Sequence, residues 1–364
     1  MKKKTLFIIN DGVYPFKTGG MEVFNYFLLK ELKERCELTY IATEEYSFTG
    51  LEFVKLPKLP LQRVTTPLCA FFYLLCHKNI RNIVLSYSSA HWLMWLLYGL
   101  IIKLLSLNTI TVIHHGKNVP CEHFGVYNNL FNYSNHVIAV SEDIKQKYDE
   151  AFGIDCKVLY PLIPFEASKI NSVQCREIYG IPQNARVFSM VGSLKCMKNP
   201  LTILQALKDM TDEELYALNP YVVYAGEGHM RSVIEKFILE NNLLDRVRLL
   251  GNLPNSKIRD VMTLTDVYVI ASDFEGTSVS LLEAMYNSKI IIASNVPGIR
   301  DMILNNVNGY LFEVKNHIDL KNCMFKCKEY SEKHKCMGKQ AREYYEKKYN
   351  HTDMINEYVA LINR

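Results

Sequence analysis

Residues 267–294 read VYVIASDFEGTSVSLLEAMYNSKIIIAS, and this stretch contains the pattern that decides the fold. The run Val267–Ala271 is short, apolar and rich in β-branched residues, which predicts a buried strand. Ser278–Asn287 has helical spacing, and a second β-branched run, Ile290–Ala293, follows it. A strand, a helix and another strand in this order form the repeating unit of a parallel α/β sheet.

The same alternation extends along both halves of the chain. Further strands are predicted at Thr5–Asn10, Leu38–Thr43, Ile83–Ser88, Thr109–His114, His136–Val140, Val187–Val191, Tyr221–Ala225 and Arg246–Leu250. We therefore predict an α/β protein of two Rossmann-like, doubly wound parallel-sheet domains, residues 1–165 and 183–345, with a cleft between them. The proline-bracketed stretch 166–182 is interpreted as a linker. We expect the helical stretch 346–364 to pack back on the first domain.

The composition is that of a soluble enzyme and argues against several other classes of protein. Apolar residues make up 49% of the chain and charged residues 22%, as in ordinary globular proteins. The net charge is only +4, and no basic tract indicates nucleic-acid binding. The ten cysteines form no CxxC pair and no zinc-site spacing, so we expect reduced thiols in a cytoplasmic protein. The apolar run after Lys4 is too short for a signal peptide and predicts a first strand.

Trp92–Ile102 is the most membrane-like segment of the chain. It is apolar or glycine throughout, but it is shorter than the roughly 20 residues that cross a bilayer. Two interpretations remain open. The segment is either a buried helix or a helix whose outer face rests on the cytoplasmic face of a membrane.

The residues after the strand Val267–Ala271 suggest a site for a sugar phosphate. Glu275 and Gly276 lie in the turn between the strand and the helix. Ser278 and Ser280 fall in the first helical turn, where free backbone N–H groups and the helix dipole favour a phosphate. Glu283 follows among apolar neighbours, where a carboxylate needs hydrogen-bond partners, and ribose hydroxyls would supply them.

With these residues, the segment EGTSVSLLEAM closely resembles the E-x7-E motif of glycosyltransferase family 4, whose members have the GT-B fold. Other segments match that family in order and spacing, so the resemblance covers nearly the whole chain. They are the glycine loop Tyr14-Pro15 to Gly19-Gly20-Met21-Glu22, the histidine loop Thr111–Gly116, Ala139–Glu142, Val191–Leu194 with Lys198, Ala225–Gly228, and Leu250–Leu253.

The resemblance implies a retaining glycosyltransferase that moves a sugar from a UDP- or GDP-sugar to a glycan or lipid-linked acceptor in cell-surface polysaccharide biosynthesis. It implies catalytic roles for Glu275, His115 and Lys198. Glu283 would bind the ribose, Glu275 the transferred sugar, and Lys198 the diphosphate. The implied donor-binding residues are Gly19, Gly20, Ser193, Lys198, Leu253, Glu275, Gly276, Thr277, Ser278, Val279 and Glu283. Of the two adjacent histidines, the family's His-Gly pairing favours His115 over His114.

Three features qualify the resemblance. Ser193 stands where the family commonly has arginine, so a bidentate phosphate contact is replaced by a hydroxyl. No Asp-x-Asp motif occurs, and we therefore expect neither a metal ion nor a cofactor besides the donor. Gly226-x-Gly228 follows a strand as in a dinucleotide fingerprint, but Arg231 stands where that fingerprint has its third glycine.

Two other functions are compatible with the same residues. A related enzyme would act on a small soluble acceptor or epimerise a sugar nucleotide. A non-catalytic protein would bind a nucleotide-sugar without turnover. The presence of Glu275, Glu283 and Lys198 together argues against such a loss of catalytic activity.

Overall fold

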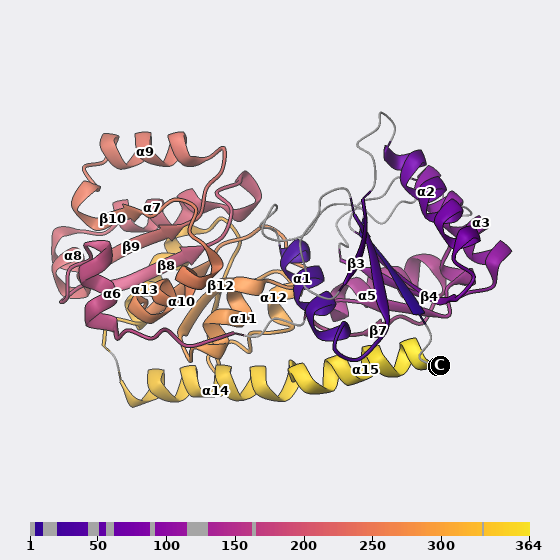
Figure 1. Cartoon of the computed structure of the whole chain (residues 1–364). Helices are drawn as coiled ribbons and strands as arrows, with labels where there is room; N and C mark the ends of the chain where they lie inside the picture. The colour runs from indigo at the N-terminus through magenta and orange to yellow at the C-terminus, as the bar shows by residue number, and fades with distance from the viewer. Residues whose placement is uncertain are drawn as a thin grey trace. The chain divides into compact units, whose positions relative to one another are not determined.

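The computed structural model describes residues 4–9, 20–42, 51–55, 62–87, 92–114, 130–161, 165–329 and 331–364. The chain divides into two compact units (Figure 1). The first unit comprises Met1–Pro164 and Tyr349–Arg364, and the second unit comprises Phe165–Lys348. Each unit contains one parallel sheet covered by helices. This confirms the predicted fold class.

The first unit is built on a seven-stranded sheet in the order β3-β2-β1-β4-β5-β6-β7. Every strand pair in it is parallel. Its elements are β1 (Lys4–Ile9), α1 (Gly20–Leu32), β2 (Leu38–Ala42), β3 (Glu52–Lys55), α2 (Gln62–Cys76), β4 (Ile80–Tyr87), α3 (Trp92–Leu105), β5 (Asn108–Ile113), β6 (His136–Ala139), α5 (Glu142–Phe152), β7 (Lys157–Val158) and α15 (His351–Asn363). The strand order reverses between β1 and β4, as doubly wound sheets require.

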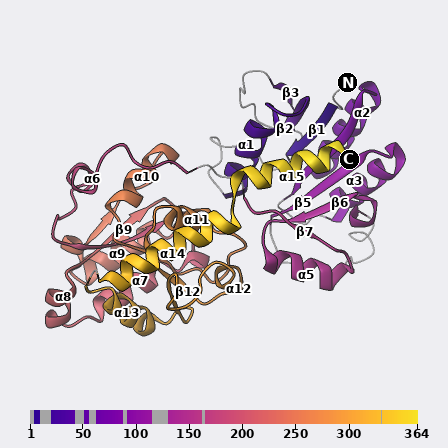
Figure 2. The same cartoon turned by 90° about the horizontal axis from the view of Figure 1, so that it is seen from below.

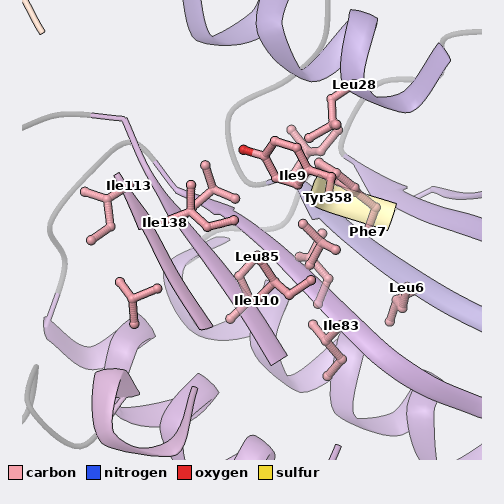
Figure 3. Packing of buried hydrophobic residues seen from close by; sticks show 14 of the residues in the cluster. Leu6, Phe7, Ile9, Leu28, Ile83, Leu85, Ile110, Ile113, Ile138 and Tyr358 are labelled. Atoms are coloured by element: carbon pink, nitrogen blue, oxygen red, sulfur yellow. The ribbon is translucent and has the colours of Figure 1, made fainter. Parts of the chain in front are cut away.

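The core of the first unit lies between the strands and the helices on both faces of the sheet (Figure 3). Phe7 of β1, Ile83 of β4 and Ile110 of β5 are almost completely buried. Tyr358 of α15 and Leu28 of α1 pack with them, so the end of the chain completes this core. The strand sequences are almost continuously apolar and β-branched because helices cover both faces of the sheet.

Helices α2 and α3 lie against each other on one face of the first sheet (Figure 1). Helix α2 connects β3 to β4, and α3 connects β4 to β5. Both connections run in the same direction across the sheet, so right-handed crossovers place the two helices on the same face. The inner face of α3 buries Met94, Trp95 and Tyr98, whereas Leu100 and Leu104 are exposed. No helix among the described residues is long and apolar enough to cross a membrane.

The second unit is built on a six-stranded parallel sheet in the order β10-β9-β8-β11-β12-β13. Its strands are β8 (Arg186–Val191), β9 (Pro220–Ala225), β10 (Val247–Leu249), β11 (Val267–Ile270), β12 (Ile290–Ser294) and β13 (Tyr310–Phe312). Its helices are α6 (Ser172–Tyr179), η1 (Cys196–Lys198), α7 (Pro200–Lys208), α8 (Asp212–Leu218), α9 (Arg231–Glu240), η2 (Leu244–Arg246), α10 (Asn255–Leu264), α11 (Val279–Tyr286), α12 (Pro297–Arg300), α13 (His317–Lys326) and α14 (Glu332–Lys348).

The stretch 166–182, interpreted from the sequence as a linker, lies within the second unit. It contains helix α6, which packs on α10 within the second unit. Asn171 and Gln174 form a capping box at the start of α6, and Gly180 ends the helix in the left-handed conformation. Cys175 on its inner face is completely buried, and this packing outweighs the polar appearance of the sequence.

The two helices at the end of the chain belong to different units (Figure 2). α14 packs on α11 and β12 in the second unit, whereas α15 packs on α1 and β5 in the first unit. Asn350 begins α15, since its side-chain oxygen accepts hydrogen bonds from the backbone N–H groups of Thr352 and Asp353. The stretch 346–364 is therefore divided, and 349–364 is the part within the first unit.

Candidate active site at the switch point of the second sheet

Strands β8 and β11 are neighbours in the second sheet and mark the point where its strand order reverses. The chain leaves β8 toward one edge of the sheet and leaves β11 toward the other. Ligands of open α/β sheets bind at the carboxyl ends of the strands at such a point. The two loops that begin there, 192–199 and 271–278, contain most of the donor-binding residues predicted from the sequence.

Lys198 and Glu275 come from these two loops and form an ion pair through Nζ and Oε1. The Ser272 hydroxyl donates to the same carboxylate oxygen at 2.6 Å. The Glu275 side chain is 9% exposed and the Lys198 side chain 23%. An ammonium group has three donors, and among the described residues Lys198 uses one of them. The remaining donors can therefore bind an anion without breaking the pair.

A network of short contacts fixes the loop that carries Lys198. Asn199 adopts a left-handed conformation with φ of 45° and begins helix α7. Its side-chain amide donates to the Ala271 carbonyl at 3.0 Å and also to the Asp273 carboxylate. The Asp273 backbone N–H in turn donates to the Met197 carbonyl at 2.8 Å. These bonds join the loops after β8 and β11, so the position of Lys198 relative to Glu275 is set by the backbone.

Helix α11 begins at the end of the second of these loops. The Ser278 hydroxyl caps it by accepting the Leu281 N–H at 3.4 Å. The Tyr268 hydroxyl donates to Ser280 Oγ at 2.7 Å and orients that side chain. The first N–H groups of a helix have no partners within it, and together with the dipole they favour a negative charge beside Lys198.

Glu283 is buried in the second turn of α11 and is 7% exposed. No hydrogen bond or ion pair to its carboxylate occurs within the described part of the chain. Burial alone raises the pKa of Glu283 to about 8, because removal from water disfavours the charged form. A buried carboxylate without a partner is unfavourable in the free protein. A ligand with hydroxyl groups would relieve this penalty.

The Gly226-x-Gly228 segment has a packing role. A Cβ atom at Gly226 would lie 1.9 Å from the Gly192 carbonyl oxygen, and one at Gly228 would lie 2.3 Å from that of Leu194. The Leu194 N–H donates to the Glu227 carbonyl at 2.9 Å across the same contact. These glycines let the loops after β8 and β9 touch through their backbones. Here they hold the Gly192–Leu194 loop in place.

The other predicted donor-binding residues of the second unit lie on the same loops or near them. Gly276 and Thr277 are half-buried between Glu275 and the cap of α11, and Val279 is the first residue of that helix. Ser193 is half-buried in the loop after β8, and Leu253 is half-buried ahead of α10. Their roles in donor binding remain predictions.

In the first unit, the predicted site falls largely on residues outside the described part. Gly19 and His115 are among these, while Gly20 is the first residue of α1. The neighbouring His114 is buried at the end of β5. Its Nε2 lies 3.0 Å from Ser86 Oγ, and Ser86 donates to the Asn25 side chain at 2.6 Å. His114 is thus held within the first unit, and the role of His115 remains a prediction.

Sequence reasoning missed the residues that support the pair. Ser272 lies two residues after the end of β11, and a hydroxyl so close to a strand end was the available signal. Gly298 could be found only in three dimensions. A Cβ atom there would lie 1.9 Å from the Glu275 carbonyl oxygen, so α12 presses against the loop that holds Glu275.

The sequence is similar to those of known glycosyltransferases. Residues 174–344 match the family model of glycosyl transferases group 1. A UDP-Gal:alpha-D-GlcNAc-diphosphoundecaprenol alpha-1,3-galactosyltransferase of Escherichia coli is 32% identical over 158 residues, which are 42% of this chain and 39% of that enzyme. An uncharacterised glycosyltransferase of Methanocaldococcus jannaschii is 26% identical over 344 residues, 92% of this chain and 91% of that protein.

The fold is also that of solved structures. The crystal structure of Anabaena HepE in complex with UDP matches with a TM-score of 0.81 at 17% identity and covers 98% of both chains. The same protein has been solved in complex with UDP-glucose. The chain therefore has the GT-B fold, and its similarity to glycosyl transferases group 1 and to the Escherichia coli enzyme supports a glycosyltransferase.

Proposed function

We propose that the protein is a retaining glycosyltransferase that transfers a sugar from a UDP-sugar to a lipid-linked or glycan acceptor in cell-surface polysaccharide biosynthesis. One observation carries the proposal. Glu283 is a buried carboxylate with no partner among the described residues, on the helix whose first turn follows the Lys198–Glu275 pair. A nucleoside diphosphate sugar supplies a group for each of these positions.

In this proposal Glu283 accepts hydrogen bonds from the ribose hydroxyls, and Glu275 accepts them from the transferred sugar. Lys198 and the N-terminal turn of α11 hold the diphosphate. As the bond between the sugar and the diphosphate breaks, negative charge grows on the leaving group, and fixed positive groups lower that barrier. Lys198 is already oriented by its pair with Glu275, so little reorganisation is needed during the reaction.

The choice of UDP rests on the relatives. Anabaena HepE was solved with UDP and with UDP-glucose, and the name of the Escherichia coli relative includes UDP-Gal and a diphosphoundecaprenol acceptor. A GDP-sugar remains the competing donor. Retention of configuration rests on the resemblance to family 4. Metal independence rests on the absence of an Asp-x-Asp motif from the sequence.

Thermal unfolding with UDP and with GDP tests the donor site. A ligand at about 100 times its dissociation constant stabilises the folded state by about 2.7 kcal/mol, so UDP should raise Tm clearly and GDP little. Glu283→Gln should lose most of this shift, whereas the exposed Glu240→Gln of α9 should keep it. Equal shifts for wild type and Glu283→Gln would contradict the proposed site.

Turnover is tested with UDP-[14C]glucose and UDP-[14C]galactose and a membrane extract as acceptor. We expect label in the lipid fraction, with the anomeric configuration of the donor kept. Activity should persist in excess EDTA. Loss in EDTA that Mn²⁺ restores would disprove metal independence but not the donor site.

A further inference from the structure

The outer face of the α2–α3 pair is apolar. On α2, Leu68, Phe72 and Leu75 are exposed and have the spacing of one helix face. On α3, Leu100 and Leu104 are exposed. Phe72 and Leu104 keep 63% and 70% of their surface accessible, which is high for large apolar side chains gathered on two adjacent helices.

The inner faces of the same helices are apolar as well. Ala70 and Leu74 of α2 and Trp95 and Tyr98 of α3 are buried in the first unit. A helix that is apolar on all sides is stable where both sides meet apolar surroundings. Within the described residues nothing covers the outer side of this pair, and an external partner would complete it.

The charge of this part of the chain indicates the chemistry of that partner. From Phe53 to Cys121 the sequence contains seven lysines and arginines and no aspartate or glutamate. Since the whole chain has a net charge of +4, the remaining residues together carry −3. Lys78, Arg81 and Lys103 are exposed close to the ends of α2 and α3. An anionic partner fits this asymmetry.

A cavity of about 690 Å³ opens at the end of α3. Lys103, His136 and Arg364 line it together with Asn108, Asn132 and Asn135, and no Asp or Glu side chain contributes. The pKa of His136 is lowered, first by burial and then by the positive charges of Arg364 and Lys157. Lys103 and Arg364 are positively charged, and Asn132 and Asn135 add side-chain amides, which suits a phosphate group.

We propose that the α2–α3 pair docks the protein on an anionic lipid bilayer, with the cavity at the end of α3 receiving a lipid phosphate. The two helices lie in the membrane interface, with their leucines and phenylalanine among the acyl chains and the basic residues at the headgroups. A bilayer fits better than a protein partner, because the large exposed side chains on the two helices are leucine and phenylalanine, with basic residues close to the helix ends. This surface is independent of the proposed donor chemistry.

The two tryptophans of the chain, Trp92 and Trp95, both lie in α3. Their fluorescence therefore reports on this helix alone. The full-length protein is mixed with phosphatidylcholine vesicles, with or without phosphatidylglycerol, and co-flotation is measured. We expect binding to the anionic vesicles, accompanied by a change in the tryptophan fluorescence of α3. High salt should weaken the binding.

Phe72→Ser with Leu104→Ser should lower vesicle partitioning by roughly a hundredfold, since burial of each such side chain is worth about tenfold. The matched control is Leu239→Ser with Leu244→Ser, two exposed leucines of the second unit that are 60% and 63% accessible. Arg81→Gln with Lys103→Gln should lower binding to anionic vesicles by roughly fivefold for each residue. All of these positions are exposed, and thermal unfolding checks that each variant is folded.

Several results would overturn the proposal. One is equal binding to neutral and anionic vesicles, and another is binding that Phe72→Ser with Leu104→Ser leaves unchanged. A third combines two findings: the wild-type protein binds no vesicles, and it sediments as a dimer that Phe72→Ser with Leu104→Ser converts to a monomer. That result would identify a second copy of the chain as the partner. Each measurement is made without donor or acceptor, so failure here leaves the proposed function standing.

Discussion

The second sheet carries buried charges at both ends of its strands, and the two ends differ in how these charges are paired. At the amino end, Arg176 donates to the carbonyls of Gln183 and Ala185 at 2.8 and 3.0 Å and to the Asp266 carboxylate at 2.8 Å. That carboxylate also accepts the Val187 N–H at 2.7 Å. At the carboxyl end, Glu283 has no partner among the described residues. The pair at the amino end holds the fold, whereas Glu283 is available to a ligand close in the chain to the Lys198–Glu275 pair.

The largest effect should come from the amino end. Arg176→Met removes the partner of Asp266 and leaves several carbonyls without a donor, and breaking a buried pair in this way costs about 3–5 kcal/mol. Urea unfolding should show that loss, while Arg300→Met on the exposed end of α12 should change little. The affinity of the folded variant for UDP should be unchanged. A strong loss of UDP affinity would show that the two ends do not differ in function.

At the carboxyl end, Lys198→Met should reduce turnover more than stability. Loss of one group that stabilises the leaving charge typically lowers kcat by about 10²–10³-fold. Lys236→Met on α9, with its side chain 73% exposed, is the control. Because Lys198→Met leaves Glu275 unpaired, the double variant Lys198→Met with Glu275→Gln should recover stability but not activity. Full activity in either variant would remove Lys198 from the mechanism.

Glu283→Gln should stabilise the free protein while weakening donor binding. Burial raises the pKa of Glu283 from its usual value of about 4.5 to about 8. The protonated form is therefore favoured in the folded state, and wild-type stability falls as the pH rises from about 4.5 to about 8. The variant lacks this loss and should exceed wild type by on the order of 5 kcal/mol at pH 9, and by almost nothing at pH 4.5. A gap that does not depend on pH would contradict the unpaired state of this carboxylate.

The smallest effect should be a proton released when the donor binds. At pH 7 a carboxyl group with a pKa of about 8 is mostly protonated, and ribose hydroxyls favour its charged form. Binding of UDP should then release up to about one proton, and affinity should rise with pH by up to about tenfold per unit below pH 8. Calorimetry in buffers of different ionisation enthalpy measures this release. Glu283→Gln should abolish it, and release by that variant would assign the proton to another group.

The strands and the motif of the second unit were predictable because their patterns are local. Val267–Ala271 and Ile290–Ala293 are β-branched runs long enough to show, and the structure has β11 and β12 there. Three short strands were missed. Glu52–Lys55 is charged at both ends, while Lys157–Val158 and Tyr310–Phe312 have too few residues for a periodic signal. Helix α6 was missed although Asn171 and Gln174 spell a capping box.

For the site, the sequence predicted that Glu283 is buried and that Glu275 ends a strand, because each follows from its neighbours in the chain. The Lys198–Glu275 pair joins residues from separate loops, and no local pattern specifies such a contact. The 1.9 Å approach that excludes a side chain at Gly298 depends on tertiary packing in the same way. Contacts of this kind can be identified only when the three-dimensional structure is known.

Helix α15 has a consequence for how the protein is made. Ile355, Tyr358, Leu361 and Ile362 are buried in the core of the first unit, although 184 residues of the second unit, Phe165–Lys348, precede them in synthesis. Domains generally fold as they leave the ribosome. The core of the first unit, however, is complete only after α15 has been synthesised. The second unit can fold first, while the nascent first unit keeps part of its apolar core open to chaperones and to the surface of a nearby membrane.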